Sequence, residues 1–155
     1  MKDAKFVLEF TTHVLANSTD ADGNRDRFQK DSKGRLIWQQ SWWYSALSQG
    51  VSLVHGLRGV KAADIHMDLA VDAKTELFRR KYGNDGKSRM HEAIFPGSEV
   101  TFNAIVADHI TASILRSILD RVGSYVGLSP YGYKLGFGKF NVIDVEVAPS
   151  DADGF

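Results

Sequence analysis

Apolar and polar residues alternate along four stretches of the chain, which is the pattern of strands with one buried face. The stretches are 5–16, 64–70, 98–106 and 140–147. In the first three, the side chains expected to point inward are Phe6, Leu8, Phe10, Val14, Ile65, Met67, Leu69, Val100, Phe102, Ala104 and Val106. The alternation therefore predicts four strands, each with one face packed against the rest of the protein.

Apolar residues recur at helical spacing in two further stretches. Ser41 is a suitable N-cap for a helix that starts at Trp42, and Gly56 or Gly59 can end it. Asp108 is expected to cap a second helix. The side chains on the apolar stripes are Trp43, Leu47, Val51 and Val54 in the first helix, and Ile110, Ile114, Leu115, Ile118, Leu119 and Val122 in the second. One helix thus follows the first strand, and the other follows the third.

The resulting order, β-α-β-β-α-β, is that of a ferredoxin-like α+β fold. The handedness of the crossovers would place both helices on one face of a four-stranded antiparallel sheet. We predict a single domain over 1–148, with two long inserted arms (17–40 and 71–97) and a mobile tail over 149–155. The alternative is an α+β fold in which the arms contribute extra strands.

The two arms carry different local signals. Within 17–40, the sequence Asp-Ser-Lys-Gly at 31–34 predicts a hairpin turn. Within 71–97, we predict a helical turn followed by a turn at 83–86, where the sequence is Gly-Asn-Asp-Gly. Connections of this length are usually functional or serve as interaction arms.

The composition limits the possible functions. The 19 Lys and Arg residues balance 19 Asp and Glu residues, and there is no cysteine. Disulfides, thiolate metal sites and cysteine nucleophiles are therefore excluded, and any nucleic-acid binding depends on local basic patches. No apolar run reaches about 18 residues, so we expect a cytoplasmic protein without a membrane partner. The common nucleotide-binding and hydrolase motifs are missing, and no cofactor is predicted.

A glycine-rich stretch precedes the last predicted strand. Glycines let backbone amides approach an anion closely, lysines add charge, and aromatic rings stack on bases. The alternative is a tight connection whose glycines relieve steric strain and whose aromatic residues belong to the core. The candidate RNA-binding residues here are Gly132, Lys134, Gly136, Phe137, Gly138 and Lys139, with Gly127 before them and Tyr131 and Tyr133 as further stacking residues.

The run Gly136-Phe137-Gly138-Lys139-Phe140, at this position in the topology, resembles the glycine-rich loop of the RAMP superfamily of CRISPR-associated proteins. The resemblance covers the topology and about twenty residues of motif. It implies a ferredoxin-like subunit that holds single-stranded RNA along its phosphates, within an assembly of several subunits that includes copies of itself. This chain departs from the family in being short and in having no net positive charge.

Basic residues in the two arms are the other candidates for contact with a phosphate backbone. We select Arg79, Arg80 and Lys81 in the second arm and Arg27 in the first. Acidic residues are interleaved with them, so a solvated surface is the alternative. Trp42 is a candidate for base stacking, because it and its neighbour Trp43 cannot both face the core.

Enzymatic activity would require clustered acid–base groups. His13, Asp64, His66 and Asp68 are expected to project from one sheet face, where they would suit a metal-dependent phosphodiesterase. The alternative is a mixed polar surface. A possible calcium loop over 20–31 lacks the required glycine at its sixth position, and a plain Asp/Gly turn is the simpler interpretation.

Three hypotheses follow from the sequence. The first is an RNA-binding subunit of a CRISPR-type ribonucleoprotein. The second is a metal-dependent RNA phosphodiesterase. The third is a self-assembling structural protein that contains no nucleic acid.

Overall fold

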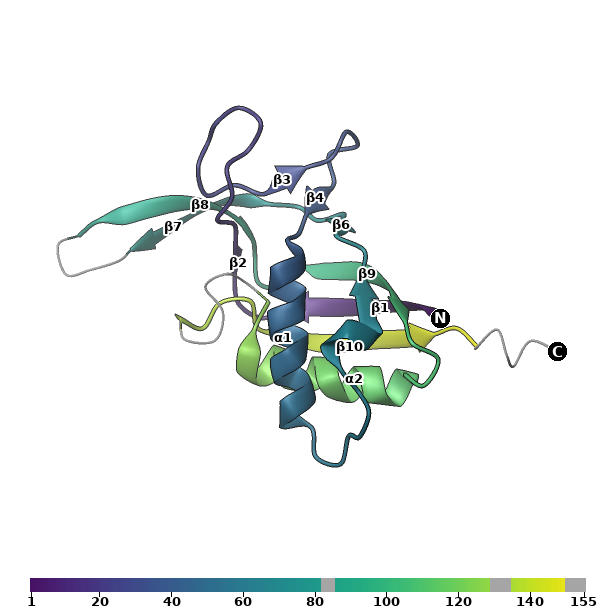
Figure 1. The fold of residues 1–155 in the computed structure, drawn as a ribbon. Helices are drawn as coiled ribbons and strands as arrows, with labels where there is room; N and C mark the ends of the chain where they lie inside the picture. The colour runs from purple at the N-terminus through teal and green to yellow at the C-terminus, as the bar shows by residue number, and fades with distance from the viewer. Residues whose placement is uncertain (82–85, 129–134, 150–155) are drawn as a thin grey trace.

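The computed structural model describes residues 1–81, 86–128 and 135–149. Its central sheet has four antiparallel strands in the order β10-β1-β9-β5. Their bounds are Lys2–Phe10 for β1, Ile65–Met67 for β5, Glu99–Val106 for β9 and Phe140–Val147 for β10. Helices α1 (Gln40–Leu53) and α2 (Ala112–Arg121) lie side by side over one face of this sheet (Figure 1). The predicted ferredoxin-like α+β fold is confirmed.

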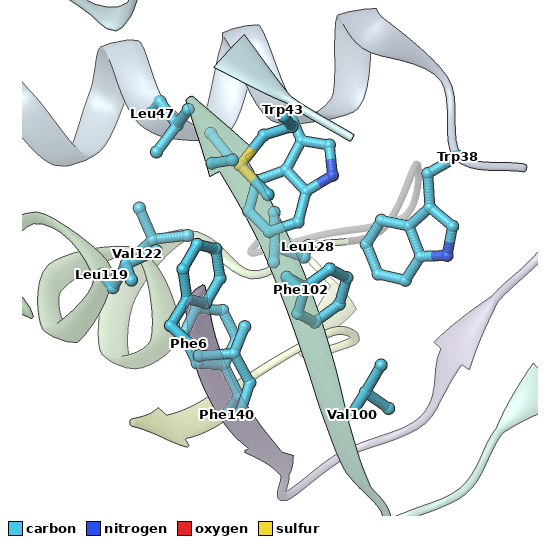
Figure 2. Packing of buried hydrophobic residues seen from close by; sticks show 14 of the residues in the cluster. Phe6, Trp38, Trp43, Leu47, Val100, Phe102, Leu119, Val122, Leu128 and Phe140 are labelled. Carbon is cyan, nitrogen blue, oxygen red and sulfur yellow. The ribbon is translucent and has the colours of Figure 1, made fainter. Parts of the chain in front are cut away.

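Aromatic side chains fill the space between the helices and the sheet (Figure 2). Phe6 of β1 stacks on Phe102 of β9 at 5.6 Å between ring centroids, and Trp43 of α1 meets the edge of Phe102 at 5.1 Å. Trp38 stacks on Trp43 at 5.7 Å and closes the end of this cluster. Because these side chains are buried, they supply much of the hydrophobic stabilisation of the fold.

Two of the predicted strands end early, and the chain then enters another sheet. β1 stops at Phe10, and Val14–Leu15 (β2) pairs with β8 (Ser88–Ile94). β5 stops at Met67, and Ala70–Val71 (β6) pairs with β4 (Leu36–Ile37). The predicted strands 5–16 and 64–70 were therefore too long. The apolar pattern continues through the break because Val14 and Val71 are buried in these smaller sheets.

The starts of the helices differ from the predicted caps. α1 begins at Gln40, and its N-cap Gln39 accepts no side-chain hydrogen bond, so Ser41 is not the cap. At α2, the Thr111 hydroxyl accepts the amide of Ile114 at 3.1 Å. Asp108 instead pairs with the amino terminus. A π-helical turn, Val122–Val126, follows α2, and a 3-10 turn, Ala62–Asp64, precedes β5.

The arms do contribute strands, as the alternative proposed. β3 (Gln29–Lys30), β4 (Leu36–Ile37) and β6 form one small sheet, and the predicted turn at 31–34 joins β3 to β4. β2, β8 (Ser88–Ile94) and β7 (Glu76–Lys81) form another. The helical turn predicted within 71–97 is wrong, because residues 76–81 pair with 88–93 as a hairpin. The turn predicted at 83–86 falls largely outside the described residues. In the described part, no helix has the length and apolarity needed to cross a membrane.

Candidate nucleic-acid interface

Two segments of the glycine-rich stretch pack directly on each other. The amide of Leu128 donates to the carbonyl of Gly138 at 2.8 Å. A Cβ on Gly127 would lie 2.4 Å from the carbonyl oxygen of Phe137, and a Cβ on Gly138 would lie 2.7 Å from the backbone of Leu128. Both glycines also have positive φ. For Gly127 and Gly138, the structure therefore supports the alternative in which the glycines relieve steric strain in a tight connection.

Gly136 differs from these two glycines. Its φ is +76°, but a Cβ there would meet nothing within 4 Å. The described residues therefore leave the space beside its Cα empty. Gly132, Lys134, Tyr131 and Tyr133 lie outside the described residues.

The returning segment is bonded to the turn that follows β1. The amide of Gly138 donates to the carbonyl of His13 at 2.8 Å, and the amide of Lys139 donates to the Thr12 hydroxyl at 2.9 Å. The carbonyl of Lys139 accepts the amide of Thr11. These bonds fix the backbone of Lys139 and leave its side chain half-buried at the edge of this turn.

Four half-buried rings meet beside this turn, and we call them the aromatic junction: His13, Phe78, Phe95 and Phe137. The His13 ring lies 4.1 Å from that of Phe78 and 4.6 Å from that of Phe95, between centroids. Phe78 also meets the edge of Phe137 at 6.3 Å. The junction therefore brings together the exit of β1, the β7–β8 hairpin and the glycine-rich segment. Partial burial lowers the pKa of His13, which favours the neutral imidazole.

The β7–β8 hairpin projects beyond the end of the sheet where β1 ends (Figure 1). Strand alternation places Phe78 and Arg80 on one face of the hairpin, and Arg79 and Lys81 on the other. Arg79 donates to the Ser88 hydroxyl at 3.1 Å and remains exposed, as does Lys81. The predicted basic residues are thus divided between the two faces.

A buried carboxylate sets the position of the hairpin. Asp26 accepts two hydrogen bonds from the Arg89 guanidinium, each 3.0 Å long. It is 7% exposed and has a φ of +58°, a conformation that non-glycine residues seldom adopt. This pair could not be predicted from the sequence, because two residues that meet across separate arms leave no periodic signal.

Two of the predicted RNA-binding residues hold the first arm in place. One guanidinium nitrogen of Arg27 donates to the carbonyl of Arg25 at 2.9 Å and to that of Met90 at 3.2 Å. Trp42 is half-buried beneath the arm, with ring edges against Phe28 and Trp38. These contacts give Arg27 and Trp42 a structural role, and they leave less of each side chain accessible to a ligand.

Comparison with solved structures finds a similar fold, whereas the comparisons by sequence find no match. No protein-family model matches the sequence, and no curated protein matches it. A chain in the cryo-EM structure of the Type III-B Cmr-beta bound to cognate target RNA is similar, with a TM-score of 0.60 over 96% of this chain. The sequence identity is 11%, and this chain spans only 61% of the length of that one. The similarity is therefore one of fold.

The four candidate catalytic residues are not brought together. The pairing of β1, β9 and β5 sets Ile65 level with Lys2, whereas His13 follows Phe10 at the opposite end of the sheet. The prediction that all four share one sheet face is wrong for His13. Residues 1–81, 86–128 and 135–149 contain no group of three or more side chains able to hold a metal ion.

The other three candidate catalytic residues, Asp64, His66 and Asp68, do not form a cluster either. Asp64 accepts the backbone amide of Lys61 at 2.9 Å and lies 3.2 Å from the His109 ring. Asp68 accepts the amide of Ala70, and His66 is exposed opposite Ile105. This arrangement offers no shared metal or acid–base site, so it gives the phosphodiesterase hypothesis no support.

The possible calcium loop consists of two separate turns. Asp20 accepts the amides of Asp22 and Asn24, and the bond from Asn24 is the main cause of its lowered pKa. Asp31 accepts the amides of Lys33 and Arg35 within the β3–β4 turn. Their carboxylates thus serve as local caps, in agreement with the simpler interpretation.

Proposed function

We propose that this chain is an RNA-binding subunit of a multi-subunit CRISPR-type ribonucleoprotein, with single-stranded RNA and other subunits as partners. The RNA would cross the aromatic junction, between the glycine-rich segment and the β7–β8 hairpin. The proposal assigns no catalytic residue and no metal.

The observation that carries the proposal is the convergence at the junction. Phe137 and Phe78 offer half-buried rings on which unpaired bases can stack. The described residues leave space beside Gly136, Lys139 supplies positive charge close to Phe137, and Arg80 lies on the same hairpin face as Phe78. Rings, open backbone and cations are the groups that bind single-stranded nucleic acid without reading its sequence.

The fold similarity supports the same function from a separate direction. The similar chain belongs to a complex bound to cognate target RNA. The matched region covers 96% of this chain.

The test is the affinity for a fluorescently labelled single-stranded RNA, measured by anisotropy over a series of salt concentrations. We expect affinity to fall as salt rises, with a slope of about −0.7 for each phosphate contact. Replacing Arg80 and Lys139 with Ala should weaken binding and reduce the slope by about 1.4 if each contacts one phosphate. Phe137→Leu should weaken binding at every salt concentration without changing the slope.

The matched control is Arg58→Ala with Lys61→Ala, two exposed cations in the loop after α1, away from the hairpin (Figure 1). This variant should bind as the parent protein does. Equal losses of affinity in the control and in the Arg80 and Lys139 variant would mean that binding depends on net charge alone. RNA affinity unchanged in all variants would refute the junction as the binding site.

A further inference from the structure

The central sheet has two edges, and its β10 edge is largely covered. The Arg116 guanidinium donates to the carbonyl of Val142 at 3.0 Å. A Cβ on Gly123 would lie 2.3 Å from the carbonyl oxygen of Phe140, so the π-helical turn packs tightly against the same strand. The register between β1 and β10 also shifts at a bulge. Covering groups and bulges are the usual means by which proteins keep another strand from pairing at an edge.

The opposite edge of the sheet is covered over only part of its length. β5 pairs with β9 at 104–106, and the amide of Asp68 donates to the carbonyl of Asn103 at 2.9 Å. Beyond that bond the chain leaves β9, since β6 pairs with β4. Among the residues that the structure describes, no strand pairs with 99–102 on the side away from β1.

The backbone of β9 presents outward-facing hydrogen-bonding groups along this uncovered part. The amide of Phe10 donates to the carbonyl of Ser98 at 3.0 Å, which fixes the alternation of the antiparallel β1–β9 ladder. In that alternation, the amides and carbonyls of Glu99 and Thr101 point away from β1. A strand rises about 3.4 Å per residue, so 99–102 has room for about four residues of an extended peptide.

A groove of about 530 Å³ lies beside this part of β9. Residues 98–100 line one side of the groove, and the segment 72–74, between β6 and β7, lines the other. This segment belongs to no strand of the described chain, and it is not paired with β9. The groove therefore has the position that one further strand of the central sheet would occupy.

Carboxylates dominate the charge beside the groove. Glu9 lies directly opposite Glu99 in the β1–β9 register, an arrangement of like charges that costs stability. Asp72 adds a third carboxylate, and Lys74 is the one cation among the described residues that line the groove. This excess of negative charge would repel the phosphates of a nucleic acid and attract a basic peptide. A second copy paired through the same edge would add its own carboxylates, which disfavours it.

We propose that this groove binds an extended, basic segment of a partner protein, which joins the central sheet as a strand beside β9. Its backbone would exchange hydrogen bonds with Glu99 and Thr101. Opposing side chains of an antiparallel pair share a face, so a Lys or Arg opposite Glu99 would lie beside the carboxylates. The next side chain would point to the buried side of the sheet, as Val100 does, and would be apolar. The segment would thus alternate basic and apolar residues.

The test begins with a phage-displayed library of random heptapeptides, selected on nuclease-treated protein without RNA. We expect enrichment of peptides in which Lys or Arg alternates with apolar β-branched residues. The strongest binder is then synthesised and added at about ten times its dissociation constant. It should slow hydrogen exchange of the Glu99 and Thr101 amides about tenfold, as measured by NMR, and leave the amides of β10 unchanged.

Two pairs of variants locate the site. Thr101→Pro removes an amide that points away from β1, whereas Thr101→Ala keeps it, so only the proline variant should weaken binding, by about tenfold. Glu99→Lys should also weaken binding of the basic peptide. Glu146→Lys, the same charge change on β10 of the same sheet face, should bind as the parent protein does. The glutamate pair keeps the test decisive if the proline variant does not fold.

Three results would overturn the proposal. They are the lack of any enriched peptide, unchanged exchange at Glu99 and Thr101, and equal losses of affinity in Glu99→Lys and Glu146→Lys. Protection of the same two amides by association of the protein with itself, without peptide, would also overturn it, because the occupant would then be a second copy. Since no RNA is present, these outcomes are independent of the RNA-binding test.

Discussion

The helix-covered face of the central sheet and the base of the β7–β8 hairpin are held together by different forces. Under the helices, Phe6, Trp43 and Phe102 belong to one cluster of buried hydrophobic residues. At the hairpin base, the buried carboxylates of Asp26 and Glu92 join the hairpin to the first arm. The sheet is therefore held mainly by apolar burial, whereas the hairpin adds to its ring contacts a few buried polar contacts that single substitutions can remove.

The largest effect should come from the core. Phe102→Ala removes a ring that contacts three other aromatic side chains, and it should lower the free energy of unfolding by about 3–5 kcal/mol. Chemical denaturation followed by circular dichroism measures this loss. Thr101→Ala, exposed on the opposite face, should change stability by no more than about 0.5 kcal/mol. Similar losses in both variants would contradict a core centred on these rings.

The next effect concerns two glycines of the same segment. Gly138→Ala combines a positive φ with a clash against the backbone of Leu128, so it should cost more than the roughly 1 kcal/mol expected from φ alone. Gly136→Ala imposes the same strained φ, but a Cβ there has open space. It should therefore lower the free energy of unfolding by only about 1 kcal/mol. Thermal unfolding of both variants tests this order, and the reverse order would rule out the close contact at Gly138.

A smaller and more local effect is expected at the hairpin base. Asp26→Asn keeps a residue type that tolerates a positive φ but removes the charge that pairs with Arg89. We expect a loss of about 1–3 kcal/mol, because the buried side of the pair loses its charged hydrogen bonds. Hydrogen exchange should become faster in the hairpin and stay unchanged in β1 and β9. Uniformly faster exchange would mean that Asp26 supports the whole fold instead.

The smallest effect depends on pH. Burial alone would raise the pKa of Glu92, but hydrogen bonds from Thr75, Lys30 and the amide of Phe28 more than offset it and lower the pKa below 4.5. The folded protein thus holds this carboxylate ionised more strongly than the unfolded chain does. Its stabilising contribution is complete above pH 4.5 and is lost as the pH falls through the lower, folded pKa.

Glu92→Gln should therefore remove part of the acid sensitivity. Unfolding free energies of the parent and the variant, measured from neutral pH to below pH 4.5, should converge as the pH falls. A constant difference across this range would show that Glu92 acts by packing and hydrogen bonding rather than by charge.

Much of the central sheet could be predicted from the sequence, because one face of each strand is buried. The alternation at Phe6, Leu8 and Phe10 and at Val100, Phe102 and Ala104 directly reflects the helix-covered face. The same pattern made the predicted strands too long where Val14 and Val71 leave the sheet, because residues buried in a second sheet are apolar as well. Alternation indicates that a residue is buried, but it does not indicate in which sheet.

The candidate site was predictable only in part. The glycines and Phe137 stood out by composition, but their neighbours did not. Phe78 and His13 reach Phe137 from distant parts of the chain, and Asp26 meets Arg89 across two arms. Such contacts depend on how the arms fold back, which local spacing does not encode. The catalytic hypothesis failed for the same reason, since strand order places His13 far from Asp64.

The most direct test of the central claim is to map where RNA touches the protein. Ultraviolet crosslinking to a single-stranded RNA, followed by mass spectrometry of the protease-digested complex, identifies the contacted peptides. We predict crosslinks in the peptides that contain Phe137 and Phe78, and none around Glu146, on the face of the central sheet opposite the helices. Crosslinks confined to that sheet face, or the lack of any crosslink at the aromatic junction when RNA is bound, would contradict this account.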